Sequence, residues 1–272
     1  MPSDINSQPR ENICFEIPEK ILDQFYIVLV NPKLPKNVGS SARAMLNMGF
    51  HNLIIVGSKD ILTKEAYALA KSAEELLKNA IFFDTLKEAL SPMEHIIGTT
   101  RRPKRYEYEI LIPEQIIPSL LEKARNNKIA ILFGPEDSGL NLEHLTFCNQ
   151  LIRIPTASEY PSINLSQSVL IICYELFKHV INYPLLERDV KRQATSCVVE
   201  GLFEHLEEFF TEIDYFPYEE HRHTMQLFRQ IYRACELSDY DLGLLRSILH
   251  KTQRYINKLK SHETTAPGTD RK

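Results

Sequence analysis

The sequence predicts an α/β fold, in which a mostly parallel sheet lies between two layers of helices and a small helical region follows. Short runs of β-forming residues alternate with longer stretches of helical periodicity over residues 24–182. These runs are apolar throughout instead of alternating with polar residues, which is typical of strands buried on both faces, as in a parallel sheet. With 272 residues, 43% of them hydrophobic, the chain is long enough to build such a core.

The elements follow one another in a regular order. Six runs are strand candidates: FYIVLV (25–30), NLIIVG (52–57), IFF (81–83), HIIGT (95–99), IAILFG (129–134) and LIRIP (151–155). The clearest helical patterns cover residues 64–79, 113–126 and 165–179. The last of these is apolar almost all round, so we expect that helix to be buried in a core or in an interface.

Composition shifts divide the chain into four parts. Residues 1–23 read as an N-terminal extension, and residues 24–182 as the α/β domain. A polar linker then leads into a helical region, 183–260, in which we expect three shorter amphipathic helices ending near Lys258. The tail, 261–272, is predicted to be disordered.

Charge and cysteine usage exclude several functional classes. The formal net charge is −4 and the pI about 6.2, so RNA binding must depend on a local basic patch. Five widely spaced cysteines without a CxxC pair argue against a disulfide framework and a zinc site, and we predict no metal. The polar N-terminus and the short apolar run 169–177 argue against a signal peptide or a membrane span, so we expect a cytoplasmic protein.

The first motif lies in NPKLPKNVGSSARAMLNMGF (31–50), just after the first strand. Asn37, Gly39 and Arg43 could simply form a turn and a solvated helix start, with Ser40 as the helix cap. An arginine at the carboxyl end of a strand is nevertheless well placed to face a ligand crevice. Neither a dinucleotide fingerprint nor a Walker loop is present, which argues against a dinucleotide-dependent oxidoreductase.

Two further motifs follow later strands. FGPEDSGL (133–140) carries two acids, which suit a turn or the positive end of a helix but not a phosphate cradle. In IPTASEYPSINLSQSV (154–169), Ser162 and Asn164 could be ordinary N-terminal caps of the next helix. All three motifs stand at carboxyl ends of strands, where α/β sheets bind ligands.

In combination, these motifs resemble those of the SpoU or TrmH-type RNA 2′-O-methyltransferases of the SPOUT class. The matching patterns are N-x-G-x-x-x-R, F-G-x-E-x-x-G-L, and I-P with S-x-N. The variant EYPSINL and the helical C-terminal part look most like the TrmJ branch, which modifies position 32 of tRNA. The resemblance implies a deep trefoil knot near the end of the α/β domain, S-adenosylmethionine bound in a bent form, and an obligate homodimer.

The resemblance also assigns roles to individual residues. The implied cofactor-binding residues are Thr99, Thr100, Arg101, Gly134, Pro135, Glu136, Ile154, Ser162, Ile163 and Asn164. The implied catalytic set is Arg43 with Asn37, Glu136, Ser162 and Asn164. We expect Arg43 to orient the RNA phosphate and stabilise the developing alkoxide, with its guanidinium held by Asn37 and Glu136.

Basic residues near these motifs are the candidates for RNA contact. They are Lys33, Lys36 and Arg43, with Arg101, Arg102, Lys104 and Arg105 in the loop TTRRPKRYEYE. Further candidates in the C-terminal helices are Arg229, Arg233, Arg246, Lys251 and Arg254. Such a charge run can also be no more than a solvated face.

Two other functions stay open. The enzyme could act on rRNA or on another tRNA position, since the motifs indicate the chemistry and not the target. A non-catalytic RNA-binding knot protein would require a damaged first motif, whereas Asn37 and Arg43 are both present.

Overall fold

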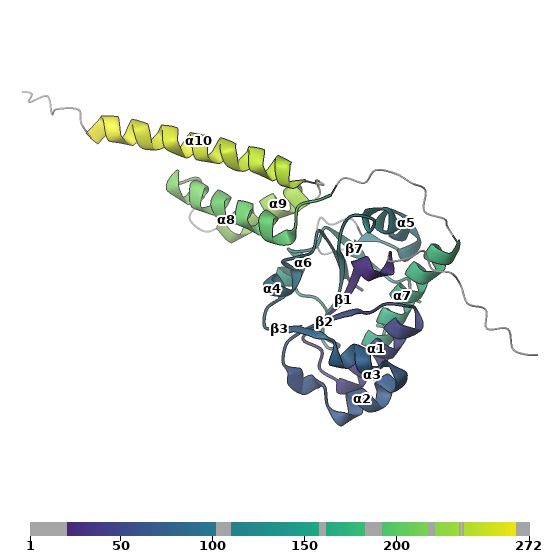
Figure 1. The fold of residues 1–272 in the computed structure, drawn as a ribbon. Coiled ribbons are helices and arrows are strands. Elements are labelled where there is room, and N and C mark those ends of the chain that lie inside the picture. Colours follow the sequence, from purple (N-terminus) through teal and green to yellow (C-terminus); the bar gives the residue numbers. More distant parts are fainter. Residues whose placement is uncertain are drawn as a thin grey trace, which may run out of the picture.

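A computed structural model describes residues 21–101, 110–157, 162–182, 192–216, 221–233, 235 and 237–264. The α/β part contains a seven-stranded sheet in the order β3-β2-β1-β6-β4-β7-β5, and every strand pair in it is parallel (Figure 1). The mostly parallel three-layer architecture predicted from the apolar runs is confirmed.

The strands lie close to the predicted positions. They are β1 (Phe25–Val30), β2 (Asn52–Val56), β3 (Ile81–Phe83), β4 (His95–Thr99), β5 (Ile110–Leu111), β6 (Ile129–Phe133) and β7 (Gln150–Ile152). The prediction missed β5, because a two-residue edge strand is too short for a periodic signal. It also placed the last strand one residue late at its start and three late at its end.

Each face of the sheet has its own core, because successive side chains of a strand point to opposite sides. Ile27 and Leu29 of β1 belong to a cluster formed with α1, α5 and α7. Val28 and Val30 belong to a second cluster, formed with α4 and α6. All four side chains are at most 1% exposed, which explains why the strand sequence shows no alternation.

The helices of the α/β part are α1 (Pro35–Asn47), α2 (Lys64–Ala70), α3 (Glu74–Lys78), α4 (Leu86–Leu90), α5 (Pro113–Lys123), α6 (Leu142–Leu145) and α7 (Leu165–Asn182). Short 3-10 turns cover Leu22–Gln24, Lys59–Ile61 and Lys71–Ala73. The C-terminal helices are α8 (Ser196–Glu212), α9 (His221–Arg233) and α10 (Asp239–Thr264).

Helix α1 begins earlier than the turn reading of the first motif requires. Pro35 occupies its first turn, which suits a residue without an N–H, and Ser40 lies inside the helix. Gly39 therefore does not shape a turn. A Cβ at Gly39 would lie 2.0 Å from the carbonyl oxygen of Ala66, so glycine allows α1 and α2 to pack closely.

The single helix predicted over residues 64–79 is divided into two. Lys71 ends α2 with a φ of 53°, and a 3-10 turn separates it from α3. Because periodicity does not reveal a left-handed residue other than glycine, the break was not visible in the sequence.

The structure differs from the expected organisation of the chain at three points. Ile21 and Leu22 are buried against the first core, so the α/β unit begins before residue 24. Helix α10 was expected to be short, but it is the longest of the described helices. It reaches Thr264, so residues 261–264 are helical and not a disordered tail. The knot implied by the family resemblance stays a prediction, because strand pairings do not define how the chain threads.

The helical unit, defined here as α8 to α10, is attached to the amino-terminal edge of the sheet. The N–H of Ser196 donates to the carbonyl of Met93 at 2.7 Å, just before β4. The N–H of Gln193 donates to Oδ1 of the buried Asn127, just before β6, at 2.8 Å. Glu94, also buried, accepts from the guanidinium of Arg192. Residues 192–196 therefore form a hydrogen-bonded anchor between the two units.

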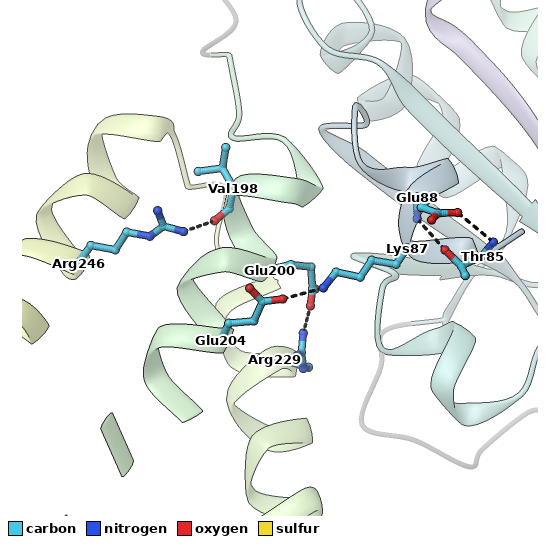
Figure 2. A network of polar contacts seen from close by, with 8 residues as sticks. All are labelled: Thr85, Lys87, Glu88, Val198, Glu200, Glu204, Arg229 and Arg246. Atoms are coloured by element: carbon cyan, nitrogen blue, oxygen red, sulfur yellow. Dashed lines mark hydrogen bonds and ion pairs between the residues drawn. The ribbon is translucent and has the colours of Figure 1, made fainter. Parts of the chain in front are cut away.

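Charged side chains add a second contact between the units (Figure 2). Lys87 of α4 donates to Glu204 of α8 at 2.7 Å, and both side chains are exposed. One turn earlier on α8, Glu200 is buried and pairs with Arg229 of α9. The Arg229 guanidinium also lies 4.6 Å from the ring centre of Phe203, which is fully buried in the core of the helical unit.

Candidate methyl-transfer site

A pocket opens at the carboxyl edge of the sheet, where β4, β6 and β7 end. Every predicted cofactor-binding residue except Asn164 lines it: Thr99, Thr100, Arg101, Gly134, Pro135, Glu136, Ile154, Ser162 and Ile163. The remaining lining residues are Phe133, Asp137, Ser138, Gly139, Leu140, Ile152, Leu165 and Ser168. Several of these belong to the motif FGPEDSGL, so the whole motif, and not only three of its residues, could have been predicted to line the pocket. No motif pattern pointed to Ser168.

The loop after β6 is folded back on itself. The N–H of Gly139 donates to the carbonyl of Pro135 at 2.8 Å, and Gly139 has a φ of +69°. A Cβ at Gly134 would lie 2.3 Å from the backbone of Gly139 and Leu140. Only glycine fits at position 134, and the tight loop presents backbone groups to the pocket.

The hydrogen bonds of Glu136 explain why this loop carries a carboxylate. Its oxygens accept from the N–H groups of Lys33 at 2.8 Å and Leu34 at 3.2 Å, and from Nδ2 of Asn37 at 2.7 Å. Leu34 is the N-cap of α1 and has no capping side chain of its own. Glu136 therefore supplies from another strand end the negative charge that a helix N-terminus favours.

Two amides extend this contact to the third motif. Asn37, which is 4% exposed, accepts at Oδ1 from Nδ2 of Asn164 at 3.0 Å. Oδ1 of Asn164 accepts from the N–H of Ser166 at 2.9 Å and so caps the start of α7. Asn164 thus acts as the simple helix cap considered above and also joins the motifs. The chain Glu136–Asn37–Asn164 connects three segments that are far apart in sequence.

Arg43 is placed differently from the expectation. It follows Asn37 by six residues, or about one and two-thirds turns, so the two side chains leave α1 in different directions. Arg43 is exposed, and within the described residues no hydrogen bond or ion pair joins it to Asn37 or Glu136. The predicted guanidinium clamp is therefore wrong for this chain. Asn37 and Glu136 instead order the loop and the helix that carry Arg43.

The basic candidates for RNA contact divide into three groups. Lys33, Lys36 and Arg101 are exposed beside the first motif or at the pocket. The remaining loop residues Arg102, Lys104 and Arg105 lie outside the described residues.

The third group belongs to the helical unit. Arg229 and Arg246 are used in internal contacts, with Glu200 and with the carbonyl of Val198. Lys251 and Arg254 are exposed and line a groove on α10. For Arg233, only the backbone is described.

The pocket is chemically suited to a nucleoside-containing cofactor such as S-adenosylmethionine. Leu140, Ile152, Ile154 and Ile163 offer apolar surface, while Thr99, Thr100 and Ser162 add hydroxyl groups. Within the described ranges, no three His, Cys, Asp or Glu side chains are grouped to hold a metal ion. None of the described helices is long and apolar enough to cross a membrane.

Two family models match the chain. The SpoU rRNA Methylase family matches residues 24–174, and the TrmJ tRNA methyltransferase C-terminal domain matches residues 198–261. The two matches correspond to the α/β unit with its pocket and to the helical unit.

Individual relatives show similarity over nearly their whole length. A tRNA (cytidine-2′-O-)-methyltransferase TrmJ of Methanocaldococcus jannaschii is 34% identical over 81% of this chain and 96% of its own. A tRNA (cytidine/uridine/adenosine-2′-O-)-methyltransferase TrmJ of Pseudomonas aeruginosa is 32% identical over 88% of this chain and 97% of its own. The crystal structure of TrmJ from Z. mobilis superimposes with a TM-score of 0.75 at 29% identity, covering 84% of this chain and 98% of that one.

Proposed function

The chain belongs to the SpoU rRNA methylase family, and from this membership we propose that it methylates a ribose 2′-hydroxyl of tRNA with S-adenosylmethionine as methyl donor. The observation that carries the proposal is the hydrogen-bonded chain from Glu136 through Asn37 to Asn164, which joins all three motifs beside a pocket lined by residues of the second and third. Relatives that match 81% and 88% of this chain are named tRNA 2′-O-methyltransferases.

The proposed target is the nucleoside at position 32, in the anticodon loop. It is supported by the resemblance to the TrmJ branch and by the match of the helical unit to the TrmJ C-terminal domain. The same chemistry on rRNA or on another tRNA position is the alternative that the experiment below separates.

S-Adenosylmethionine supplies an electrophilic methyl group when bound, so the protein's own task is to bind and orient. The backbone of Gly134–Glu136 and residues Thr99 to Arg101 would hold the cofactor from two sides. Ser162 and Ile163 would close it from the third loop, which Asn164 fixes to α1. A site whose walls are fixed before binding loses little free energy in ordering them.

Arg43 is the proposed catalytic residue. A guanidinium keeps its proton at neutral pH, so it is suited to holding a phosphate and stabilising a developing alkoxide, and not to accepting the proton. Its exposed position on α1 leaves it accessible to RNA, while the buried Asn37 one and two-thirds turns earlier fixes the helix. Lys33, Lys36 and Arg101 would contact neighbouring phosphates.

We also place the enzyme in the cytoplasm as a homodimer formed through α7. This helix buries Val169, Ile172 and Leu176 in the core but leaves Leu170 and Tyr174 39% and 48% exposed. A helix with two apolar faces can pack one face against its own core and the other against a partner subunit.

Methyl transfer from labelled S-adenosylmethionine tests the proposal. Bulk tRNA and rRNA are offered separately, and the 2′-O-methyl position is mapped. We expect the mark in tRNA at position 32, and a loss of at least about 100-fold in kcat for Arg43→Ala with unchanged cofactor affinity. Arg43→Lys keeps the charge without the bidentate fork and should recover only part of the rate. Full activity of Arg43→Ala would refute its role, and a mark only in rRNA would refute the target.

A further inference from the structure

Helix α10 carries a continuous stripe of exposed apolar side chains. The stripe consists of five residues: Tyr240, Leu244, Ile248, Tyr255 and Leu259. These residues are, in this order, 81%, 56%, 54%, 64% and 49% exposed. Separations of four or seven residues place them on one face of the helix. Figure 1 shows α10 along the outside of the molecule with α8 beside it.

The stripe is not the face by which α10 is held in its own chain. Leu242 is buried in the core of the helical unit, and Leu245 and Leu249 pack against that core. These residues follow a different helical line from the stripe residues. Five large apolar side chains on a second face are unusual for a surface without a partner.

The four outer stripe residues are spaced symmetrically about the point between Leu249 and His250. An antiparallel neighbour with the same sequence brings Tyr240 opposite Leu259 and Leu244 opposite Tyr255. In the central layer, Ile248 lies opposite Lys251, whose aliphatic stem can cover it while its ammonium reaches water. We infer that the partner of this stripe is a second copy of α10, packed antiparallel about a two-fold axis.

Charge favours the same direction of packing. The first turn of α10 carries Asp239 and Asp241, whereas its last turns carry Lys258 and Lys260. An antiparallel pair places the acidic end of each helix beside the basic end of the other, and it also opposes the two helix dipoles. A parallel pair would place like charges together. Because salt screens exposed charges within about 8 Å, these charges select the direction, and the stripe supplies the attraction.

The stripe runs along most of the length of α10. The stripe spans 20 residues, or about 29 Å of helix. An isologous contact uses it twice, with ten large side chains in all, and a specific interface needs about 1,000 Å².

RNA is a weaker candidate for this face. The basic residues of α10, among them Arg246, His250 and Arg254, line the groove on the neighbouring side of the helix. A phosphate backbone follows positive charge, so RNA suits that groove better than the apolar stripe. Pairing through the stripe covers Lys251 at the edge of this groove and leaves Arg246, His250 and Arg254 outside the contact. The pairing does not depend on the proposed methyl transfer.

Cysteine cross-linking tests the pairing and its direction. One variant carries Leu244→Cys and another Tyr255→Cys, both with Cys14, Cys197 and Cys235 replaced by serine. When the two variants are mixed under mild oxidation, we expect the cysteine at position 244 of one to form a disulfide with the cysteine at position 255 of the other. Leu244→Cys alone should not form one, because eleven residues, or about 16 Å along the axis, separate the two cysteines in an antiparallel pair. Cross-linking of Leu244→Cys to itself alone would indicate parallel packing and overturn the inference.

Mass measurement provides the second test. In a chain with Leu170→Glu and Tyr174→Glu, which removes the proposed α7 contact, pairing through α10 should still give a dimer by light scattering. Adding Leu244→Glu should give a monomer, whereas adding Asn257→Glu, the same charge off the stripe, should not. The inference is overturned if the wild-type stripe forms no dimer and no cross-link. A loss of tRNA affinity in the stripe variant without any change in mass would identify the face as an RNA surface instead.

Discussion

The α/β unit and the helical unit use their polar and apolar residues in opposite ways. Asn37, which is bonded to the pocket residue Glu136, is almost fully buried, and both ends of its amide are bonded, so its position is fixed by two other segments. On α10, the apolar side chain of Tyr240 is 81% exposed, and nothing in its own chain covers it within the described residues. The difference indicates a division of tasks, in which the α/β unit holds a small molecule in one geometry and the helical unit presents surfaces to large partners.

Gly134→Ala should have the largest effect on the pocket. The new methyl group would lie 2.3 Å from the backbone of Gly139 and Leu140, so the loop must open. We expect at least about a 100-fold loss of activity, with cofactor binding lost as measured by calorimetry, because a misplaced site loses that much rate. Gly243→Ala is the matched control, since its Cβ meets nothing within 4 Å and the helix should gain about 0.5–1 kcal/mol. Normal cofactor affinity in Gly134→Ala would contradict the role of this loop.

Glu200→Ala should have the largest effect on the helical unit. It leaves Arg229 beside a buried core without its carboxylate, which we expect to cost about 3 kcal/mol in the free energy of unfolding of that unit. Denaturant titration followed by helical circular dichroism measures the loss. Glu204→Ala, one turn later on α8 and exposed, should cost less than about 1 kcal/mol. Equal losses for both variants would mean that burial does not set the strength of these pairs.

Glu136→Gln sharpens the comparison within the pocket. The amide keeps the shape but loses the charge at the start of α1, and one of its ends can only donate. We expect about 1–2 kcal/mol of lost stability and about a tenfold loss in kcat/KM, because α1 carries Arg43. Glu65→Gln, an exposed acid in the first turn of α2, is the matched control and should cost less than about 1 kcal/mol of stability and leave kcat/KM unchanged. If both variants behave alike, Glu136 is only one more acid near a helix start.

The smallest expected effect concerns the contact between the units. The hydrogen bond to Glu204 raises the pKa of Lys87, and the same bond lowers the pKa of Glu204. The pair therefore stabilises the docked state between about pH 5 and pH 10; this stability is lost as Glu204 takes up a proton at lower pH and as Lys87 releases one at higher pH. A double-mutant cycle with Lys87→Ala and Glu204→Ala should give a coupling of about 0.2–1 kcal/mol at pH 7 and a smaller one at pH 3. A coupling as large at pH 3 as at pH 7 would contradict an ionic contact.

The sequence was most informative where burial alone determines structure. The run FYIVLV predicted β1 to the residue, because a strand covered on both faces shows its burial directly in its composition. The helix over 64–79 was predicted without its break, since the positive φ of Lys71 depends on tertiary packing. Gly39 was assigned to a turn, because its actual neighbour, Ala66, approaches from another helix.

The site could be predicted as a set of residues but not as a set of contacts. The family resemblance gave about half of the pocket lining, since its motifs come in a fixed order at strand ends. They could not show that Glu136 bonds to the start of α1 instead of to Arg43, because that depends on the direction in which each side chain leaves its helix or loop. The apolar stripe of α10 was also not recognised, since helical periodicity does not distinguish a covered face from an uncovered one.

The anchor at residues 192–196 has a consequence for substrate size. It fastens the helical unit to the edge where strands begin, whereas the pocket lies where they end, and a five-residue strand is about 17 Å long. An RNA that occupies the pocket must therefore extend past the whole length of the strands to touch the basic groove of α10 in the same chain. A folded tRNA is large enough to do so, and the length of the strands would then favour intact tRNA over short fragments.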